Sequence, residues 1–239
     1  QESLFDENAM NDVISNFMLP DVTINANIQE AEYKNWNEEW EEAGFERINI
    51  NDSITIYDAR HDDGNGIASG ISIGIETKQA FGTGTHETTR MIVSTLLNID
   101  IKGKRVLDCG CGTGILGIAA SKLGASEVVG YDIDEWSSEN AIHNAELNGV
   151  GNMKVMLGDA SVLKSVEGKF DVVLANINRN ILLADMPAFV SVMADDSLLI
   201  LSGFYASDVD LLIEKASSLG LSKIDSKSDS EWTCLVLKK

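Results

Sequence analysis

The segment Val106–Gly117 constrains this chain most, because three glycines stand at alternate positions between an apolar run and an apolar helical pattern. Glycine adopts left-handed turns, and permits the close backbone approach, that a strand–turn–helix junction beside a nucleotide requires. A second apolar run ends at Asp132, about 20 residues beyond the first glycine, where a carboxylate can accept hydrogen bonds from ribose hydroxyls. The glycines are Gly110, Gly112 and Gly114. Together these features predict a site for an adenosyl group.

The spacing of the glycines distinguishes two kinds of adenosyl cofactor. A dinucleotide fingerprint has glycines at its first, third and sixth positions, and the sixth position here is Ile115. The spacing G-x-G-x-G favours S-adenosyl-L-methionine instead, because its amino-acid tail and sulfonium can lie against bare main chain. A glycine-rich turn that only joins a strand to a helix is the simpler alternative, and the acidic strand end at Asp132 argues against it.

Downstream of about Lys102, predicted strands and helices alternate with short connections. Such alternation predicts a doubly wound α/β fold, with a mostly parallel sheet and helices on both faces. The last two strands have no helix between them and predict a hairpin, which makes one edge strand antiparallel. Pro187 should kink or interrupt its helix. The predicted strands are 105–108, 127–132, 153–157, 170–175, 197–202, 221–226 and 232–237, and the predicted helices are 115–123, 135–148, 179–193 and 207–219.

The N-terminal third follows a different pattern. An amphipathic helix is predicted at 5–19 and a half-exposed strand at 22–28. Residues 35–42 are acidic and helix-like, with Trp36 and Trp40 on one face, and strands are predicted at 47–50, 53–57 and 71–75. We therefore predict a small partial α+β domain at 1–32, a linking helix and strands at 33–75, and the adenosyl-binding domain at 76–239.

Composition narrows the class of protein. The net charge is −20, from 38 acidic and 18 basic residues, which argues against direct binding of nucleic acid and favours basic partners. No membrane span or signal peptide is visible. The three cysteines have neither disulfide nor metal-ligand spacing, so we expect no metal site and a cytoplasmic protein. The chain opens at Gln1 without an initiator Met, so we expect that residues upstream are missing.

A loop rich in small and hydroxyl residues, Phe81–Thr89, precedes the sheet. Thr85 is predicted to cap a helix at 86–97, whose start offers donors for a carboxylate. This loop, the glycine segment, Asp132–Asp134 and Ala175–Ile177 together resemble the ribosomal protein L11 methyltransferases, and residues 35–40 are similar to the linker of that family. The resemblance covers the chain from about Glu30. It implies a Rossmann-like class I methyltransferase with a seven-stranded sheet and a shortened N-terminal substrate-recognition domain.

The resemblance also implies a reaction and a set of site residues. The cofactor would be S-adenosyl-L-methionine, and the partner would be ribosomal protein L11, methylated on lysine and N-terminal amines. The cofactor contacts of the family correspond to Thr89, Gly110, Asp132 and Asn176, and Gly112 belongs to the same glycine loop. Asn176 ends a strand at the carboxyl edge, where ligands bind in open α/β sheets, and is also the candidate for positioning the acceptor amine. Asp159 is a candidate for the adenine amine, as in many class I methyltransferases.

Other interpretations stay open at this point. A methyltransferase of this class could act on another protein or on a small molecule. A nucleotide-binding regulatory or dehydrogenase-like domain is the alternative from another class. His86 is either a catalytic base or, as we favour, a residue that structures its loop. One alternative for Asp134 is that it does no more than cap the helix that follows it. The corresponding alternative for Asn176 is that it only ends its strand in a turn.

Overall fold

The computed structural model describes residues 6–17, 22, 24, 26, 44–67, 70–77 and 82–239. The chain divides into two compact units, Gln1–Asn35 and Trp36–Lys239. In the first unit, α1 (Glu7–Ser15) is shorter than the predicted helix, and Asp6 caps it by accepting hydrogen bonds from two amides of its first turn. The predicted helix at 35–42 and most of the predicted strand at 22–28 lie outside the described residues. The division into regions at 1–32, 33–75 and 76–239 stays a prediction.

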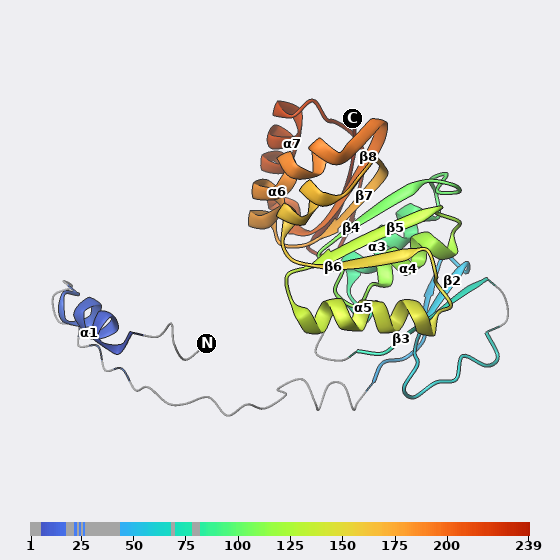
Figure 1. Cartoon of the computed structure of the whole chain (residues 1–239), viewed down its shortest axis with the longest axis horizontal. Coiled ribbons are helices and arrows are strands. Elements are labelled where there is room, and N and C mark those ends of the chain that lie inside the picture. Colours follow the sequence, from blue (N-terminus) through green and yellow to red (C-terminus); the bar gives the residue numbers. More distant parts are fainter. Residues whose placement is uncertain are drawn as a thin grey trace. The chain divides into compact units, whose positions relative to one another are not determined.

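The second unit is built on a seven-stranded sheet with the order β6-β5-β4-β7-β8-β10-β9 (Figure 1). The five strands from β6 to β8 run parallel, and β10 runs antiparallel to both of its neighbours. This arrangement confirms the predicted doubly wound, mostly parallel sheet. The strands are β4 (Arg105–Cys109), β5 (Glu127–Asp132), β6 (Met153–Leu157), β7 (Phe170–Asn176), β8 (Met193–Tyr205), β9 (Ser222–Asp229) and β10 (Trp232–Lys238).

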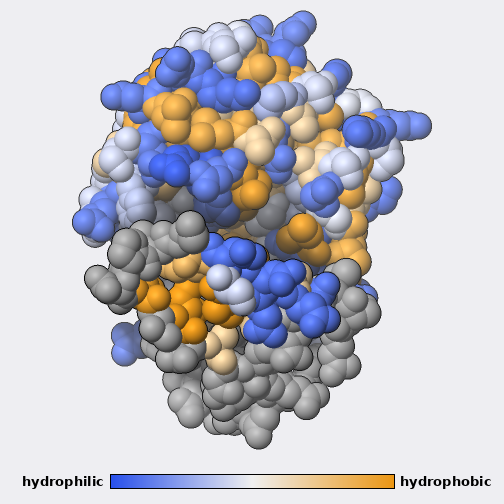
Figure 2. All heavy atoms as spheres, turned by 90° about the vertical axis from the view of Figure 1, so that its left-hand side faces the viewer, coloured by the Kyte–Doolittle hydropathy of each residue, from blue (hydrophilic) through white to orange (hydrophobic). Residues whose placement is uncertain are grey.

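Helices cover both faces of this sheet, because its central strands carry apolar side chains on both sides. In β4, Val106 belongs to the core with α3, α4 and α5, whereas Leu107 belongs to the core with α6 and α7. Figure 1 shows these two groups of helices on opposite sides of the sheet. On the face with α6 and α7, hydrophobic residues are interspersed with hydrophilic ones (Figure 2). The helices are α3 (Glu87–Leu96), α4 (Ile115–Lys122), α5 (Glu135–Leu147), α6 (Arg179–Val192) and α7 (Val209–Ser218).

Two predicted details differ from the structure. The helix α6 runs through Pro187 as one continuous element, so the predicted interruption does not occur. The predicted helix at 207–219 begins instead as the short 3-10 helix η3 (Ala206–Asp208), which α7 follows. Both elements still lie where the sequence predicts a helix, because their apolar residues Leu182, Phe189 and Leu212 are buried in the same core.

The predicted hairpin is confirmed, and the structure adds its order. The last strand, β10, lies between β8 and β9, so the antiparallel strand is the second from the edge and not, as predicted, the edge strand itself. Five consecutive residues of β10 are buried, whereas β9 is polar and almost entirely exposed. The apolar strand gains most from an inner position, and a charged edge strand resists pairing with other chains. These preferences explain why the final strand is inserted inside the sheet.

A small three-stranded sheet precedes the large one and packs on the same core as α3 and α4. Its strands are β1 (Ile48–Ile50), β2 (Ile54–Asp58) and β3 (Ile71–Ile75), close to the predicted ranges. Ile56 and Ile73 are fully buried in this core. Two asparagines hold the end of β3: Asn148, the C-cap of α5, pairs with the backbone of Gly74, and Asn144 in α5 pairs with that of Glu76. The small sheet is therefore fixed to α5, on the face of the large sheet that α3, α4 and α5 cover.

Candidate functional site

The glycine loop joins β4 to α4 at the carboxyl end of the sheet. Gly110, Gly112 and Gly114 have φ angles of 66°, 52° and 81°, in the region where other residues are strained. A Cβ atom on Gly110 would lie 2.5 Å from Cγ2 of Ile177. The loop backbone therefore stands directly against the segment that follows β7, which a side chain at Gly110 would push away. The hydroxyl of Thr113 donates to the carbonyl of Gly82 at 2.6 Å and ties the preceding loop to this one.

Asp132 is the last residue of β5, and its carboxylate is held against the glycine loop. Oδ2 accepts a hydrogen bond from the amide of Gly112 at 2.9 Å, and Oδ1 accepts one from the amide of Asp134 at 3.0 Å. Each oxygen keeps a lone pair for a further donor. The carboxylate of Asp134 accepts from the amide of Ser137 at 2.8 Å and caps α5, which confirms that prediction.

Asn176 and Thr89 meet on the opposite side of the loop. Asn176 is the last residue of β7, and its Nδ2 donates to Oγ1 of Thr89 at 3.3 Å. Thr89 lies in the first turn of α3 and is almost completely buried. Because the amide nitrogen faces the threonine, the carbonyl oxygen of Asn176 is the group left to accept a proton donor.

Asp159 lies beyond Asp132, after β6, where it caps the 3-10 helix η2 (Ala160–Ser165). Its Oδ1 accepts from the amide of Ser161 at 2.9 Å. Hydrogen bonds from Ser161, first from its side chain and then from its backbone, hold the pKa of Asp159 below the ordinary aspartate value. The carboxylate is therefore an ionised acceptor at neutral pH.

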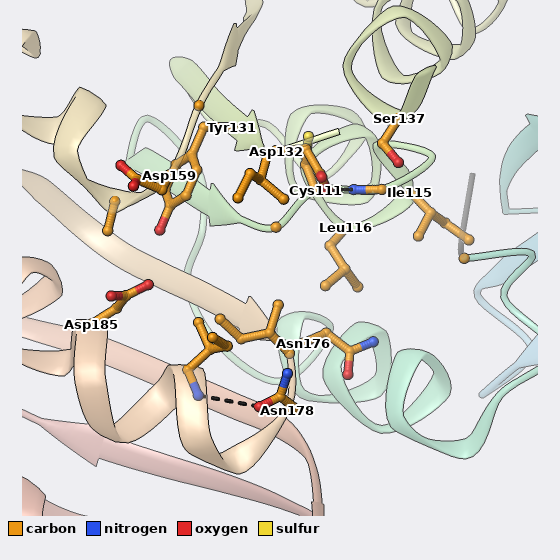
Figure 3. A pocket seen from close by; sticks show the side chains of 18 of the residues that line it. Cys111, Ile115, Leu116, Tyr131, Asp132, Ser137, Asp159, Asn176, Asn178 and Asp185 are labelled. Carbon is orange, nitrogen blue, oxygen red and sulfur yellow. Dashed lines mark hydrogen bonds between the residues drawn. The ribbon is translucent and has the colours of Figure 1, made fainter. Parts of the chain in front are cut away.

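The structure brings all six predicted site residues to one cavity of about 540 Å³ (Figure 3). Thr89, Gly110, Gly112, Asp132, Asp159 and Asn176 all line it. Several other residues that line the cavity were not among the predicted ones. Tyr131 could have been found because it directly precedes Asp132, and Asn178, Ile181 and Asp185 because their spacing places them on one face of a helix. The contact of Ile177 with Gly110 had no local signal.

The buried carboxylate of Asp108 holds the start of α4, the helix that follows the glycine loop. Asp108, in β4, is 1 % exposed, and its Oδ2 accepts from the amide of Gly117 in α4 at 2.9 Å. Its Oδ1 has no hydrogen-bond partner among the described residues. Burial, and to a smaller degree the charge of Asp132, raises the pKa of Asp108 to about 7. The side chain thus fixes the start of α4 while part of its hydrogen-bonding capacity is unused.

His86 caps α3, so the prediction that Thr85 does so is wrong. The ring Nδ1 of His86 accepts from the amide of Thr88 at 3.3 Å. Thr85 pairs instead with Thr83, their hydroxyl oxygens 2.6 Å apart. The His86 ring packs edge-on against Trp232, with centroids 4.8 Å apart. These contacts support the loop-structuring interpretation of His86.

The described part of the chain holds no group of three or more His, Cys, Asp or Glu side chains arranged to bind a metal ion. Its three cysteines are buried as free thiols. No helix in the ranges described above has both the length and the apolar character needed to cross a membrane.

Known proteins resemble this chain in sequence, in fold or in both. The family model described as ribosomal protein L11 methyltransferase (PrmA) matches residues 2–239. A ribosomal protein L11 methyltransferase from Phocaeicola vulgatus is 47% identical over 98% of this chain and 83% of the relative. The crystal structure of the ribosomal protein L11 methylase from Lactobacillus delbrueckii has a TM-score of 0.74 at 30% identity, covering 81% of this chain and 98% of the other. The precorrin-6y C5,15-methyltransferase from Geobacter metallireducens, at 13% identity and a TM-score of 0.55, covers 70% of this chain and 93% of the other, and shares the fold alone.

The strand order, the glycine loop and the cavity at the carboxyl edge define the Rossmann-like fold of class I methyltransferases. Within that class, the match over nearly the whole chain is specific. The chain belongs to the ribosomal protein L11 methyltransferase family.

Proposed function

We propose that this protein transfers methyl groups from S-adenosyl-L-methionine to lysine and N-terminal amines of ribosomal protein L11. The observation that carries the proposal is the convergence of the glycine loop, Asp132 and Asn176 on one cavity, in a chain of this family. The relatives are named for methylation of ribosomal protein L11. The residues that line the cavity supply the recognition and the positioning that the reaction needs.

The cavity fits the proposed cofactor in size and in chemistry. Small-molecule sites have volumes of roughly 300–1,000 Å³, and this one has about 540 Å³. Bare main chain at Gly110 and Gly112 can approach the amino-acid tail, and Thr89 stands on the same side. The oriented oxygens of Asp132 can accept both ribose hydroxyls. Asp159 would then stand beside the adenine.

The reaction needs alignment more than it needs acid–base groups. When bound, the cofactor supplies a methyl group on a positively charged sulfur that is already a good leaving group. The carbonyl oxygen of Asn176 can accept an N–H of the acceptor amine, which would direct the nitrogen lone pair toward the methyl group. Apolar side chains of Ile115, Leu116 and Ile177 line the cavity and would exclude water from the reacting atoms.

The acceptor must arrive as a neutral amine. A lysine in water has a pKa of about 10.4, and partial burial in the cavity would lower it. The carboxylates among the described lining residues would lie near the ribose and the adenine of the cofactor. We assign none of them as the acceptor of the lysine proton. The proton would leave to solvent before the amine enters.

The charge of the protein suits this partner. With a net charge of −20, the enzyme would attract a basic protein and disfavour direct contact with nucleic acid. Ribosomal proteins are made in the cytoplasm, where buried free thiols such as those of Cys109 and Cys111 stay reduced. We therefore place the reaction there.

The test combines binding with transfer. The protein should bind S-adenosylhomocysteine in isothermal titration and should transfer labelled methyl groups to purified ribosomal protein L11, with the modified amines located by mass mapping. Asn176→Ala should reduce the transfer rate at saturating cofactor more than it reduces cofactor affinity, with Asn180→Ala on the exposed side of α6 as the control.

The other interpretations are outcomes of the same experiment. Cofactor binding without transfer to ribosomal protein L11 would reject this acceptor in favour of another protein or a small molecule. Binding of NAD in place of S-adenosylhomocysteine would reject the methyltransferase activity and support a dehydrogenase-like domain.

A further inference from the structure

Two polar side chains in the cavity have no part in the reaction described above. Tyr131 comes from β5 and Asp185 from α6, and both line the cavity beside Asp159. We call these three residues the base end of the cavity, after the nucleobase of the proposed cofactor. In Figure 3 the carboxylates of Asp159 and Asp185 lie on two sides of a gap, with the Tyr131 hydroxyl directed toward it.

The Tyr131 hydroxyl is an unsatisfied group. The residue is 4 % exposed, and apart from the neighbouring thiol of Cys109 its hydroxyl has no hydrogen-bond partner among the described residues. Burial in the first place, and the neighbouring thiol of Cys109 in the second, raises the pKa of Tyr131, so the hydroxyl keeps its proton. A thiol is a weak hydrogen-bonding group. A buried hydroxyl without a partner is costly, so a ligand that accepts from it would be favoured.

Asp185 is similarly without a partner. In the described part of the chain no hydrogen bond or ion pair is made by its carboxylate. Partial burial, and then the negative charge of Asp159, raises the pKa of Asp185. Two carboxylates that face one gap repel each other, and a donor with two N–H groups between them would replace that repulsion by two hydrogen bonds.

The position of Asp185 follows from the helix that carries it. Asn178, Ile181 and Asp185 all line the cavity, and their spacing of three and four residues places them on one face of α6. Asn178 caps this helix by accepting from the amides of Asn180 and Ile181, at 3.1 and 3.2 Å. The cap fixes where α6 starts and therefore which residues face the cavity.

We infer that Asp185 and Tyr131 complete, with Asp159, a pocket that selects the amino group of the adenine ring. This inference rests on the proposed function, because the adenine belongs to the proposed cofactor. The exocyclic amine of adenine has two N–H groups, so each carboxylate accepts one, and the Tyr131 hydroxyl donates to a ring nitrogen beside it. Hypoxanthine and guanine carry a carbonyl oxygen in the place of this amine. Two carboxylates repel such an oxygen, so the pocket discriminates against both bases.

The experiment compares two ligands that differ only in this group. The full chain is titrated calorimetrically with S-adenosylhomocysteine and with S-inosylhomocysteine, in which a carbonyl replaces the amine. We expect the unmodified protein to prefer the adenosyl ligand by at least about 100-fold. Asp185→Ala should weaken the adenosyl ligand about 10-fold or more and leave the inosyl ligand unchanged or tighter. The control Asp210→Ala, which removes an exposed acid from α7, should change neither affinity.

Tyr131→Phe separates recognition from a structural role. The variant should bind S-adenosylhomocysteine several-fold more weakly, while the free protein melts at the same or a higher temperature, because an unpaired buried hydroxyl has been removed. A lower melting temperature with unchanged affinity would show that the hydroxyl is structural and would overturn its part of the inference.

The inference and the proposed function fail in different ways. Equal weakening of both ligands by Asp185→Ala, or no weakening of either, would overturn the selection of the amine while the proposed function stands. Failure of the unmodified protein to bind S-adenosylhomocysteine at all would overturn both.

Discussion

The two ends of the cavity are built in different ways. At the loop end, Asn176 already holds Thr89, and Asp132 already accepts from Gly112 and Asp134. At the base end, the Tyr131 hydroxyl and the Asp185 carboxylate have no such partners among the described residues. The loop end is therefore organised before a ligand binds, whereas the base end completes its hydrogen bonds only with one. One part of the site can therefore orient a ligand while another part selects it.

Gly203→Ala should have the largest effect, and it tests how tightly the loop end is packed. Gly203, in β8, has a φ of 91°, and a Cβ there would lie 2.5 Å from the carbonyl oxygen of Ile177. Because that neighbour is backbone, Gly203→Ala must displace the segment that follows Asn176. We expect a loss of about 3 kcal/mol in the free energy of unfolding, measured by chemical denaturation, and a fall in the methyl-transfer rate.

Gly220→Ala is the matched control for this change. Gly220 has a similar φ of 85°, but nothing lies within 4 Å of its Cβ position. Its substitution should cost only about 1 kcal/mol, for the left-handed backbone. Equal losses in the two variants would mean that the contact with Ile177 is not tight, and the contrast between the two ends would weaken.

The next prediction compares the acids of the two ends. Asp132→Ala removes the proposed ribose ligand together with the anchor of the Gly112 amide. It should weaken S-adenosylhomocysteine binding by about 1.5–3 kcal/mol, the scale of a lost charged hydrogen bond. Asp159→Ala should weaken it by a smaller factor, because Asp185 remains to accept from the same amine. Calorimetric titration checks both, and unchanged affinity in Asp132→Ala would show that this residue does not bind the ribose.

A third prediction concerns the pH dependence of the loop end. Unfolding returns Asp108 to its ordinary pKa of 3.8, whereas the folded value is about 7. Between these values the folded state binds more protons, so the contribution of Asp108 to stability falls as the pH rises from about 4 to 7. Asp108→Asn removes this titration. From pH 5 to pH 8 the variant should therefore gain about 3 kcal/mol relative to the unmodified protein, as measured by urea denaturation at both pH values. Parallel pH curves for the two proteins would contradict the raised pKa.

The smallest expected effect concerns His86. His86→Asn should keep the transfer rate within a few-fold of the original, because asparagine is a good helix N-cap. His86→Ala should lower the free energy of unfolding by about 1 kcal/mol through the lost cap. A large loss of rate in the Asn variant, with normal folding and cofactor binding, would identify His86 as a catalytic base. His86 would then have a catalytic role at the loop end in addition to its structural one.

Much of the fold could be predicted because its signals are local. The alternation of apolar runs gave the strands of the large sheet, and glycine spacing located the turn after β4. Of the two effects predicted for Pro187, the break does not occur, since the buried apolar face of α6 keeps the helix continuous despite its missing backbone donor. The cap of α3 was placed one residue early because histidine is not among the usual N-cap residues.

Patterns among neighbouring residues were enough to predict the class of fold, the glycine loop and the acidic end of β5, because local residues set the backbone conformation and the burial of a segment. Three other features came from packing in three dimensions: the place of β10 inside the sheet, the close approach of Gly203 to Ile177, and the position of Tyr131 and Asp185 on one cavity. The physical reason is that each of these depends on atoms far apart in the chain, whose distance is set by packing and leaves no local pattern.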